Sequence, residues 1–200
     1  MRKFILGISF FSFFTALIFS QLNCTQQQEE KAINKETRVE RGKYLVNLGG
    51  CNDCHSPKIF TQNGPIPDTT MLLSGAHAAV TSLDFDPKIV AHGKWVVCNS
   101  DFTAWLGSWG ISYTANLTPD KETGLGNWTE ERFIKALRTG KHLGEGRPIL
   151  PPMPWPFIGK LKDEDLKDIF AYLQSLTPID NKVPDPQTPD DLAKLSIGKK

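Results

Sequence analysis

Two cysteines and one histidine lie close together in the sequence CNDCH at residues 51–55. In this C-x-x-C-H spacing, each thiol can form a thioether to one vinyl group of a haem, and the adjacent histidine can ligate the iron. A thioredoxin-like redox pair needs a βαβ setting, and no strand-rich pattern flanks the motif. A structural zinc site needs a second pair of ligands, whereas His77 and His92 are isolated. The motif therefore predicts one covalently bound haem c, held by Cys51, Cys54 and His55.

A haem with one histidine ligand has a second axial position, and the segment PPMPWP at residues 151–156 offers a methionine for it. The prolines around Met153 exclude a helix and largely fix the backbone, so a normally flexible side chain is aimed in one direction. We therefore predict His55 and Met153 as the two iron ligands. The alternatives are an open site or one of four other residues, namely Met71, His77, His92 and His142.

Three segments with helical periodicity are expected to position these residues. The first, from about residue 37, ends at Gly49-Gly50 and leads directly into the haem motif. The second covers about residues 129–139, with acidic residues at its start and Gly140 at its end. The third covers about residues 163–176, with its apolar residues on one stripe and Pro178 after its end.

The segment from residue 56 to residue 123 is long and only weakly periodic. We expect mostly irregular chain around the cofactor, with a short helix near residues 87–92 or a small hairpin. Cys98 is expected to be a small buried apolar residue. The prediction for the whole is an all-α fold, with three or more helices around one covalent haem and long irregular loops.

The first 23 residues are predicted to be a signal peptide. Arg2 and Lys3 precede an apolar run that ends at Phe19 and is too short for a comfortable membrane-spanning helix. Covalent haem attachment in bacteria takes place outside the cytoplasm, so export and the haem motif support each other.

The sequence around the end of this signal, SQLNC at residues 20–24, is similar to a relaxed lipoprotein cleavage site. In that interpretation Cys24 carries lipid, and the polar residues 24–38 form a tether. Ordinary cleavage near Ser20 and an uncleaved anchor are the alternatives. Residues 39–178 are then the cofactor-binding domain, and residues 179–200 a loosely ordered tail.

The charge of the chain limits its partners. The formal net charge is +1, and removal of residues 1–23 deletes two basic residues and no acid, which leaves 21 basic against 22 acidic side chains. A near-neutral surface gives no support for nucleic-acid binding, which normally requires a basic stripe.

Together, the helix leading into C-x-x-C-H, the late methionine in a proline-rich loop and the final amphipathic helix resemble class I mono-haem cytochromes c. The segments YTANLTPD (113–120), GLGNWTEE (124–131) and PMP (152–154) are similar to haem domains of cytochrome subunits from bacterial membrane alcohol and gluconate dehydrogenases. The resemblance implies that Asn116 lies at the haem edge, as a partner of a propionate or of the pocket backbone. It also implies that the first and last helices cross, with Gly42 facing Phe170 or Tyr172.

The function expected from these features is transfer of single electrons by an exported mono-haem cytochrome rather than enzymatic catalysis. Its partners would be redox proteins, such as a dehydrogenase, an oxidase or another cytochrome. It would lie in the periplasm or at the cell surface, tethered to the membrane through Cys24. The alternatives are a peroxidase-like haem enzyme and a gas-sensing domain in which Met153 is displaced.

Overall fold

The computed structural model describes residues 34, 37–83, 86–192, 194 and 196–197. The chain divides into two compact units, residues 1–38 and residues 39–200. The predicted signal peptide lies outside the described residues, and so does most of the predicted tether. Among the described residues, no helix is both long enough and apolar enough to cross a membrane.

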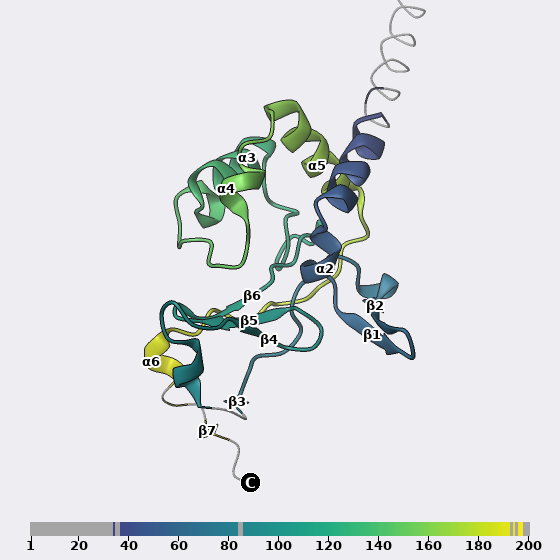
Figure 1. Cartoon of the computed structure of the whole chain (residues 1–200). Coiled ribbons are helices and arrows are strands. Elements are labelled where there is room, and N and C mark those ends of the chain that lie inside the picture. The colour runs from purple at the N-terminus through teal and green to yellow at the C-terminus, as the bar shows by residue number, and fades with distance from the viewer. Residues whose placement is uncertain (1–33, 35–36, 84–85, 193, 195, 198–200) are drawn as a thin grey trace, which may run out of the picture. The chain divides into compact units, whose positions relative to one another are not determined.

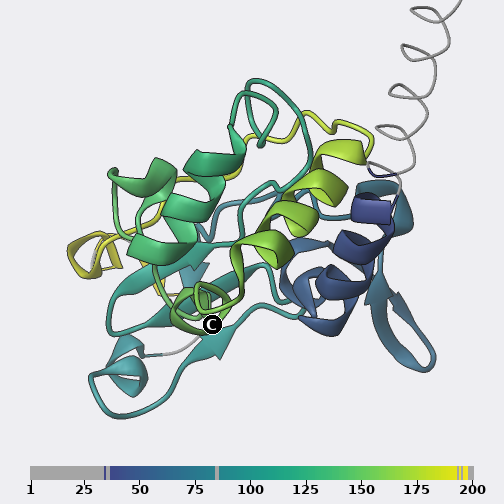
Figure 2. The ribbon, with the colours of Figure 1, turned by 90° about the horizontal axis from the view of Figure 1, so that it is seen from above.

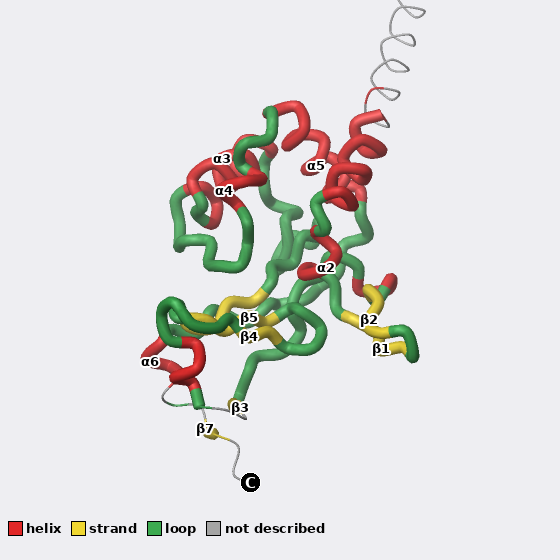
Figure 3. The backbone as a smooth tube through the Cα atoms, in the orientation of Figure 1, coloured by secondary structure: helices red, strands yellow, loops and turns green. Residues whose placement is uncertain are grey.

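Helices form most of the regular structure (Figures 1 and 3). The first described helix covers residues 37–48. The others are α2 (Cys51–His55), α3 (Glu130–Thr139), α4 (Trp155–Ile158), α5 (Asp163–Ser175) and α6 (Pro189–Leu192). Three 3-10 turns accompany them: η1 (Thr69–Met71), η2 (Pro87–Val90) and η3 (His142–Gly144).

The bounds of α3 follow from its capping residues. The Thr129 hydroxyl accepts a hydrogen bond from the backbone N–H of Arg132, which satisfies one of the free donors at the helix start. Glu130 and Glu131 place negative charge in the first turn, where the helix dipole favours it. Gly140 ends the helix in the left-handed conformation, with φ 65°. The second predicted helix is therefore confirmed.

The main apolar core joins the helices of the unit formed by residues 39–200. Its buried residues come from the first helix, from α3 and α5, and from two loops: Val46, Leu73, Leu125, Phe133, Leu137, Leu166, Ile169, Phe170, Tyr172 and Leu173. The first helix crosses α5 at Gly42, where a Cβ atom would lie 1.9 Å from the backbone oxygen of Asp168 and 2.8 Å from Tyr172 Cβ. Only glycine allows this approach, and the predicted contact with Tyr172 is confirmed.

Residues 58–113 contain more strand than the single small hairpin that we expected. Strands β1 (Lys58–Thr61) and β2 (Gly64–Pro67) form an antiparallel hairpin. Strands β4 (Val97–Cys98), β5 (Ala104–Gly107) and β6 (Gly110–Tyr113) form an antiparallel sheet. Strand β3 (Ser82–Leu83) pairs in parallel with β7 (Ser196–Ile197). Each strand has only two to four residues, too few for a clear alternation of apolar and polar positions. The mainly helical fold with long loops is otherwise as predicted.

The β4–β5–β6 sheet has one apolar face. Leu106 and Ile111 are paired across β5 and β6, and residues opposite each other lie on the same face. Both belong to a second buried cluster, with Leu83, Val90 and Leu192. The opposite face carries Trp105 and Ser112, which form the neighbouring pair in the register.

Residues 179–192 return to the rest of the unit through specific contacts, which the sequence did not suggest. The backbone groups of Gln187 and Ile111 exchange two hydrogen bonds, at 2.8 and 3.0 Å. The amide of Asn181 donates to the backbone oxygens of Ser74 (2.8 Å) and Ala76 (3.0 Å). Figure 2 shows this segment passing from the end of α5 to α6.

Candidate functional site

Both cysteines of the motif and its histidine lie in the single short helix α2. Gly50 separates α2 from the first helix, and its φ of 63° is a left-handed conformation that glycine adopts without strain. Cys51 and Cys54 are three residues apart and therefore project from one side of the helix. Both are half-buried free thiols, as is Cys98 on β4.

The imidazole of His55 is fixed by a backbone carbonyl. Its Nδ1 atom lies 2.8 Å from the oxygen of Ala115. A carbonyl oxygen can only accept, so Nδ1 carries the hydrogen and Nε2 is left with a free lone pair. Burial lowers the pKa of His55, and the hydrogen bond to Ala115 offsets only part of this effect. The neutral ring therefore dominates at pH 7. A neutral, oriented imidazole with a free Nε2 is suited to bind a metal ion.

The two thiols are not activated as nucleophiles. Burial raises the pKa of Cys51, and burial together with the nearby charge of Asp53 raises the pKa of Cys54. Reactive cysteines instead have lowered pKa values, because the thiolate is the attacking species. Among the described residues, no group of three or more His, Cys, Asp or Glu side chains is arranged to hold a metal ion. This environment does not favour a thiol redox centre.

Met153 lies in a loop that is held at both ends. Its side chain is half-buried and packs against the main core. Before it, the Ser112 hydroxyl donates to the backbone oxygen of Pro151 at 2.5 Å. After it, α4 packs against α3, and a Cβ on Gly140 would lie 2.3 Å from the ring of Trp155. The loop thus has little freedom at the methionine.

The other candidate ligands lie in different settings. Met71 ends η1 and is half-buried, and its backbone oxygen accepts a hydrogen bond from Ser74. His77 is exposed, with Nε2 3.0 Å from the Ser74 hydroxyl. His92 is also exposed. His142 is exposed and meets the ring of Trp128 edge-on, with centroids 5.2 Å apart.

Asn116 is buried, and its side chain binds backbone and neighbouring side chains. Its Nδ2 donates to the oxygen of Ile179 at 2.8 Å and to the Thr123 hydroxyl at 3.1 Å. Its Oδ1 accepts from the N–H and the hydroxyl of Thr118. Asn116 therefore fastens the segment that carries Ala115 to the chain beyond α5.

Thr114 and Trp109, which flank β6, were not identified as site residues from the sequence. The N–H of Thr114 donates to the oxygen of Thr103, so the pairing of β5 with β6 continues by one residue. Side chains two residues apart share a face, which places Thr114 on the face of Ser112. The ring of Trp109 covers Gly107 on that same face, because a Cβ on Gly107 would lie 2.3 Å from a ring carbon.

Two buried donors on this face have no partner in the described part of the chain: the indole Nε1 of Trp109 and the hydroxyl of Thr114. Buried polar atoms are nearly always hydrogen-bonded, so an unpaired pair indicates a missing acceptor. An ionised carboxylate only accepts hydrogen bonds, and haem carries two carboxylates at one edge. Ser112 on the same face contacts the loop of Met153, and Thr114 precedes Ala115, which holds His55. The residues present therefore fit a haem.

Comparisons with known proteins agree with this site. The cytochrome c family model matches residues 39–177. The fructose dehydrogenase cytochrome subunit of Gluconobacter japonicus is 29% identical over 178 residues, which are 88% of this chain and 29% of that protein. The alcohol dehydrogenase (quinone) cytochrome c subunit of Gluconobacter oxydans (strain 621H) is 32% identical over 153 residues, 75% of this chain and 24% of that protein. The gluconate 2-dehydrogenase cytochrome c subunit of Pantoea cypripedii is 28% identical over 165 residues, 82% of this chain and 29% of that protein.

The chain spans less than a third of the length of these three relatives. The matched region nevertheless includes the C-x-x-C-H helix, the segment that holds His55, the loop of Met153 and the last core helix. An imidazole aimed by a carbonyl, beside two thiols that can form thioethers, is the arrangement expected for covalent haem c. On the family match and this geometry together, the chain belongs to the cytochrome c family.

Proposed function

We propose that this cytochrome c carries single electrons through one haem that is covalently bound by Cys51 and Cys54 and ligated by His55 and Met153. Haem iron bound in this way supplies one-electron chemistry, because it cycles between the ferric and ferrous states. The observation that carries the proposal is the 2.8 Å contact between His55 Nδ1 and Ala115 O, which leaves Nε2 free at the helix that bears both thiols.

The loop of Met153 supports methionine as the second ligand. Ser112 fastens one end of the loop and α4 the other, so the thioether has a defined position. A soft thioether favours ferrous iron and raises the reduction potential relative to two histidines. Occupation of both axial positions leaves the iron without a site for substrate, which favours electron transfer over peroxidase chemistry and over gas sensing.

A dehydrogenase is the proposed partner. This proposal is supported by the relatives of this chain, which are cytochrome subunits of fructose, alcohol and gluconate dehydrogenases. The near-neutral charge predicts transient docking in which apolar contacts contribute more than long-range steering. The donor and acceptor would meet the protein at the exposed haem edge.

Export and a lipid tether complete the proposal, and they rest on residues 1–38 of the sequence. Replacing Cys24 by serine tests the tether. The parent should take up a fatty acid label and fractionate with membranes, whereas the variant should lose the label and be released. Retention of both proteins in membranes without label would instead support an uncleaved anchor.

The number and linkage of the haem test the function most simply. The exported protein should keep a single haem through denaturing electrophoresis, with an intact mass equal to that of the chain plus one haem. Cys51→Ala and Cys54→Ala should each leave one thioether, and the double variant should lose its haem to acid-acetone extraction. A haem that is extractable from the parent would contradict the proposal.

A further inference from the structure

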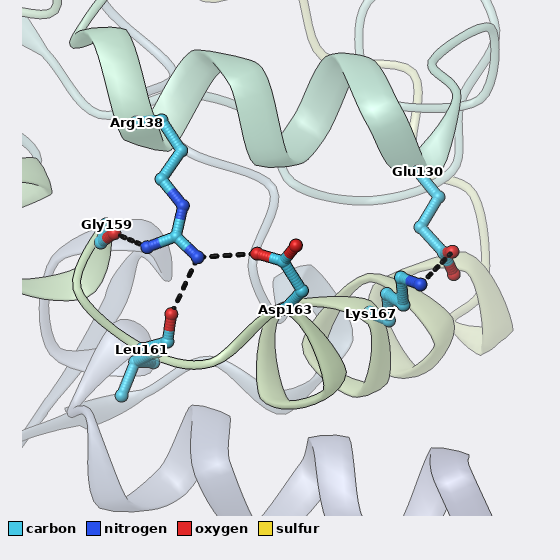
Figure 4. Close-up of polar contacts among 6 residues, drawn as sticks. All are labelled: Glu130, Arg138, Gly159, Leu161, Asp163 and Lys167. Atoms are coloured by element: carbon cyan, nitrogen blue, oxygen red, sulfur yellow. Dashed lines mark hydrogen bonds and ion pairs between the residues drawn. The ribbon is translucent and has the colours of Figure 1, made fainter.

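Arg138, in the last turn of α3, binds the connection between α4 and α5 through three groups (Figure 4). Its Nη1 donates to the backbone oxygen of Gly159. Its Nη2 donates to the oxygen of Leu161 at 2.8 Å and pairs with the carboxylate of Asp163 at 2.5 Å. The planar guanidinium binds the three acceptors from two nitrogens in a fixed arrangement, whereas a lysine would present its three donors from a single atom.

The segment held by Arg138 is the one that follows the methionine loop. Met153 and α4 are separated only by Pro154. Helix α4 has four residues and no side-chain cap at its start, so its position depends on tertiary contacts rather than on its own stability. A Cβ on Gly159 would lie 2.3 Å from the oxygen of Leu137, so α4 ends in direct contact with α3.

The contacts of Arg138 differ in what they contribute. The side chain of Arg138 is 37% exposed and that of Asp163 is 59% exposed, so solvent weakens their ion pair. The carbonyl oxygens of Gly159 and Leu161 are fixed backbone atoms, and hydrogen bonds from a charged donor are stronger than neutral ones. The hydrogen bonds to the two carbonyl oxygens should therefore contribute most to fixing the α4–α5 connection against α3.

We propose that Arg138 is a positioning residue for Met153. By fastening the end of α4 to α3, it limits the movements that withdraw the sulfur from the iron. This inference rests on the proposed His/Met ligation. It concerns how firmly the ligand is held, and not whether Met153 is the ligand.

Binding of imidazole to the ferric protein measures this directly, because imidazole can bind only when the methionine has left. The apparent dissociation constant for imidazole varies inversely with the fraction of molecules in which Met153 has left the iron. We expect Arg138→Gln to lower that constant at least tenfold, so that the weak far-red sulfur-to-iron band, which reports methionine ligation in the ferric spectrum, disappears at a lower imidazole concentration. Arg138→Lys keeps the charge but loses the planar donors, so its dissociation constant for imidazole should lie between those of the parent and of Arg138→Gln.

Two further variants separate charge from contact. Lys135→Gln removes the same charge from α3, where Lys135 pairs with Glu145 at 3.2 Å and not with the α4–α5 connection. Asp163→Asn removes only the ion pair. Both should stay within twofold of the parent, and thermal unfolding should verify that all variants are folded.

The inference is overturned if folded Arg138→Gln and Arg138→Lys both bind imidazole within twofold of the parent, or if Lys135→Gln matches Arg138→Gln. A parent protein without the far-red band would overturn the ligand assignment itself, before any variant is compared. Failure of the positioning role is therefore distinguishable from failure of the proposed function.

Discussion

The Nδ1 atom of His55 lies 2.8 Å from the backbone oxygen of Ala115, which is 60 residues later in the chain. Ala115 follows shortly after β6, and Ser112 on β6 donates to Pro151 at the start of the methionine loop. A single stretch of backbone is thus in contact with the histidine on one side and with the methionine loop on the other. Substitutions along this stretch should therefore alter the positions of the two iron ligands.

Gly75 contacts both His55 and the segment after β6, and its replacement should destabilise the fold. Its N–H donates to the oxygen of His55 at 2.8 Å, its φ is 81°, and a Cβ there would lie 2.5 Å from the oxygen of Thr114. We expect Gly75→Ala to lower the free energy of unfolding by about 2 kcal/mol or more, from backbone strain and the clash together.

Gly93→Ala is the matched control for that substitution. Gly93 has a similar φ of 76°, but its Cβ would meet no atom within 4 Å. Strain alone should cost this variant about 1 kcal/mol. Denaturant unfolding of the two ferric proteins gives the comparison, and equal losses of stability would mean that the contact at Thr114 contributes nothing.

The unpaired donors beside β6 should affect the reduction potential. Trp109→Phe and Thr114→Val each remove one donor and keep most of the shape of the side chain. Without the donor, the negative charge of a haem carboxylate is less compensated, which favours ferric iron. We expect each variant to lower the potential by on the order of 20–60 mV in a spectroelectrochemical titration, a part of the energy of one charged hydrogen bond.

Trp105→Phe is the control for the tryptophan variant, because the indole of Trp105 already donates to the oxygen of Phe102 at 2.8 Å. Its potential should stay close to that of the parent. If Trp105→Phe shifts the potential as much as Trp109→Phe does, the effect is a general one of the sheet and not of the unpaired donor.

Asp120 should make stability depend on pH in the acid range. Its carboxylate accepts hydrogen bonds from the hydroxyl (2.7 Å) and the N–H (2.8 Å) of Thr123, and these bonds hold its pKa below the ordinary value. A depressed folded pKa gives stability that is present above the unfolded pKa and is lost as pH falls through the folded one.

Asp120→Asn should therefore lower the melting temperature at pH 7, and the difference from the parent should shrink as the pH falls below about 4. Melting curves from pH 3 to pH 7 test this. Glu122→Gln, which removes a neighbouring exposed charge, is the control for the loss of one negative charge in this loop. A difference for Asp120→Asn that grows toward low pH would mean that its sign has been assigned wrongly.

Local patterns in the sequence were sufficient to predict the three longest helices and the haem motif, but not the four-residue helices α4 and α6. Thr129, the acidic first turn and Gly140 define α3 in the sequence as they do in the structure. The contact of Gly42 with Tyr172 also follows from the resemblance, because a glycine within a helix needs a close neighbour to justify it. These features depend on residues near one another in the sequence, on a motif, or on the resemblance to a known family.

The contacts that orient the site could not be predicted in the same way. Ala115 acts through its backbone oxygen, which no residue type reveals. Arg138 and Ser112 bind backbone oxygens of distant segments, and any surface arginine or serine looks the same in the sequence. The strands β4 to β6 are too short to leave a periodic signal, although their sheet carries the unpaired donors.

The identity of the second iron ligand is the claim on which the account depends most, and the ferric absorption spectrum of two methionine variants tests it. The parent and Met71→Ala should be low-spin, with a weak sulfur-to-iron band in the far red. Met153→Ala should lose this band, become high-spin or take another ligand, and have a lower reduction potential. The account is contradicted if Met71→Ala loses the band while Met153→Ala keeps it.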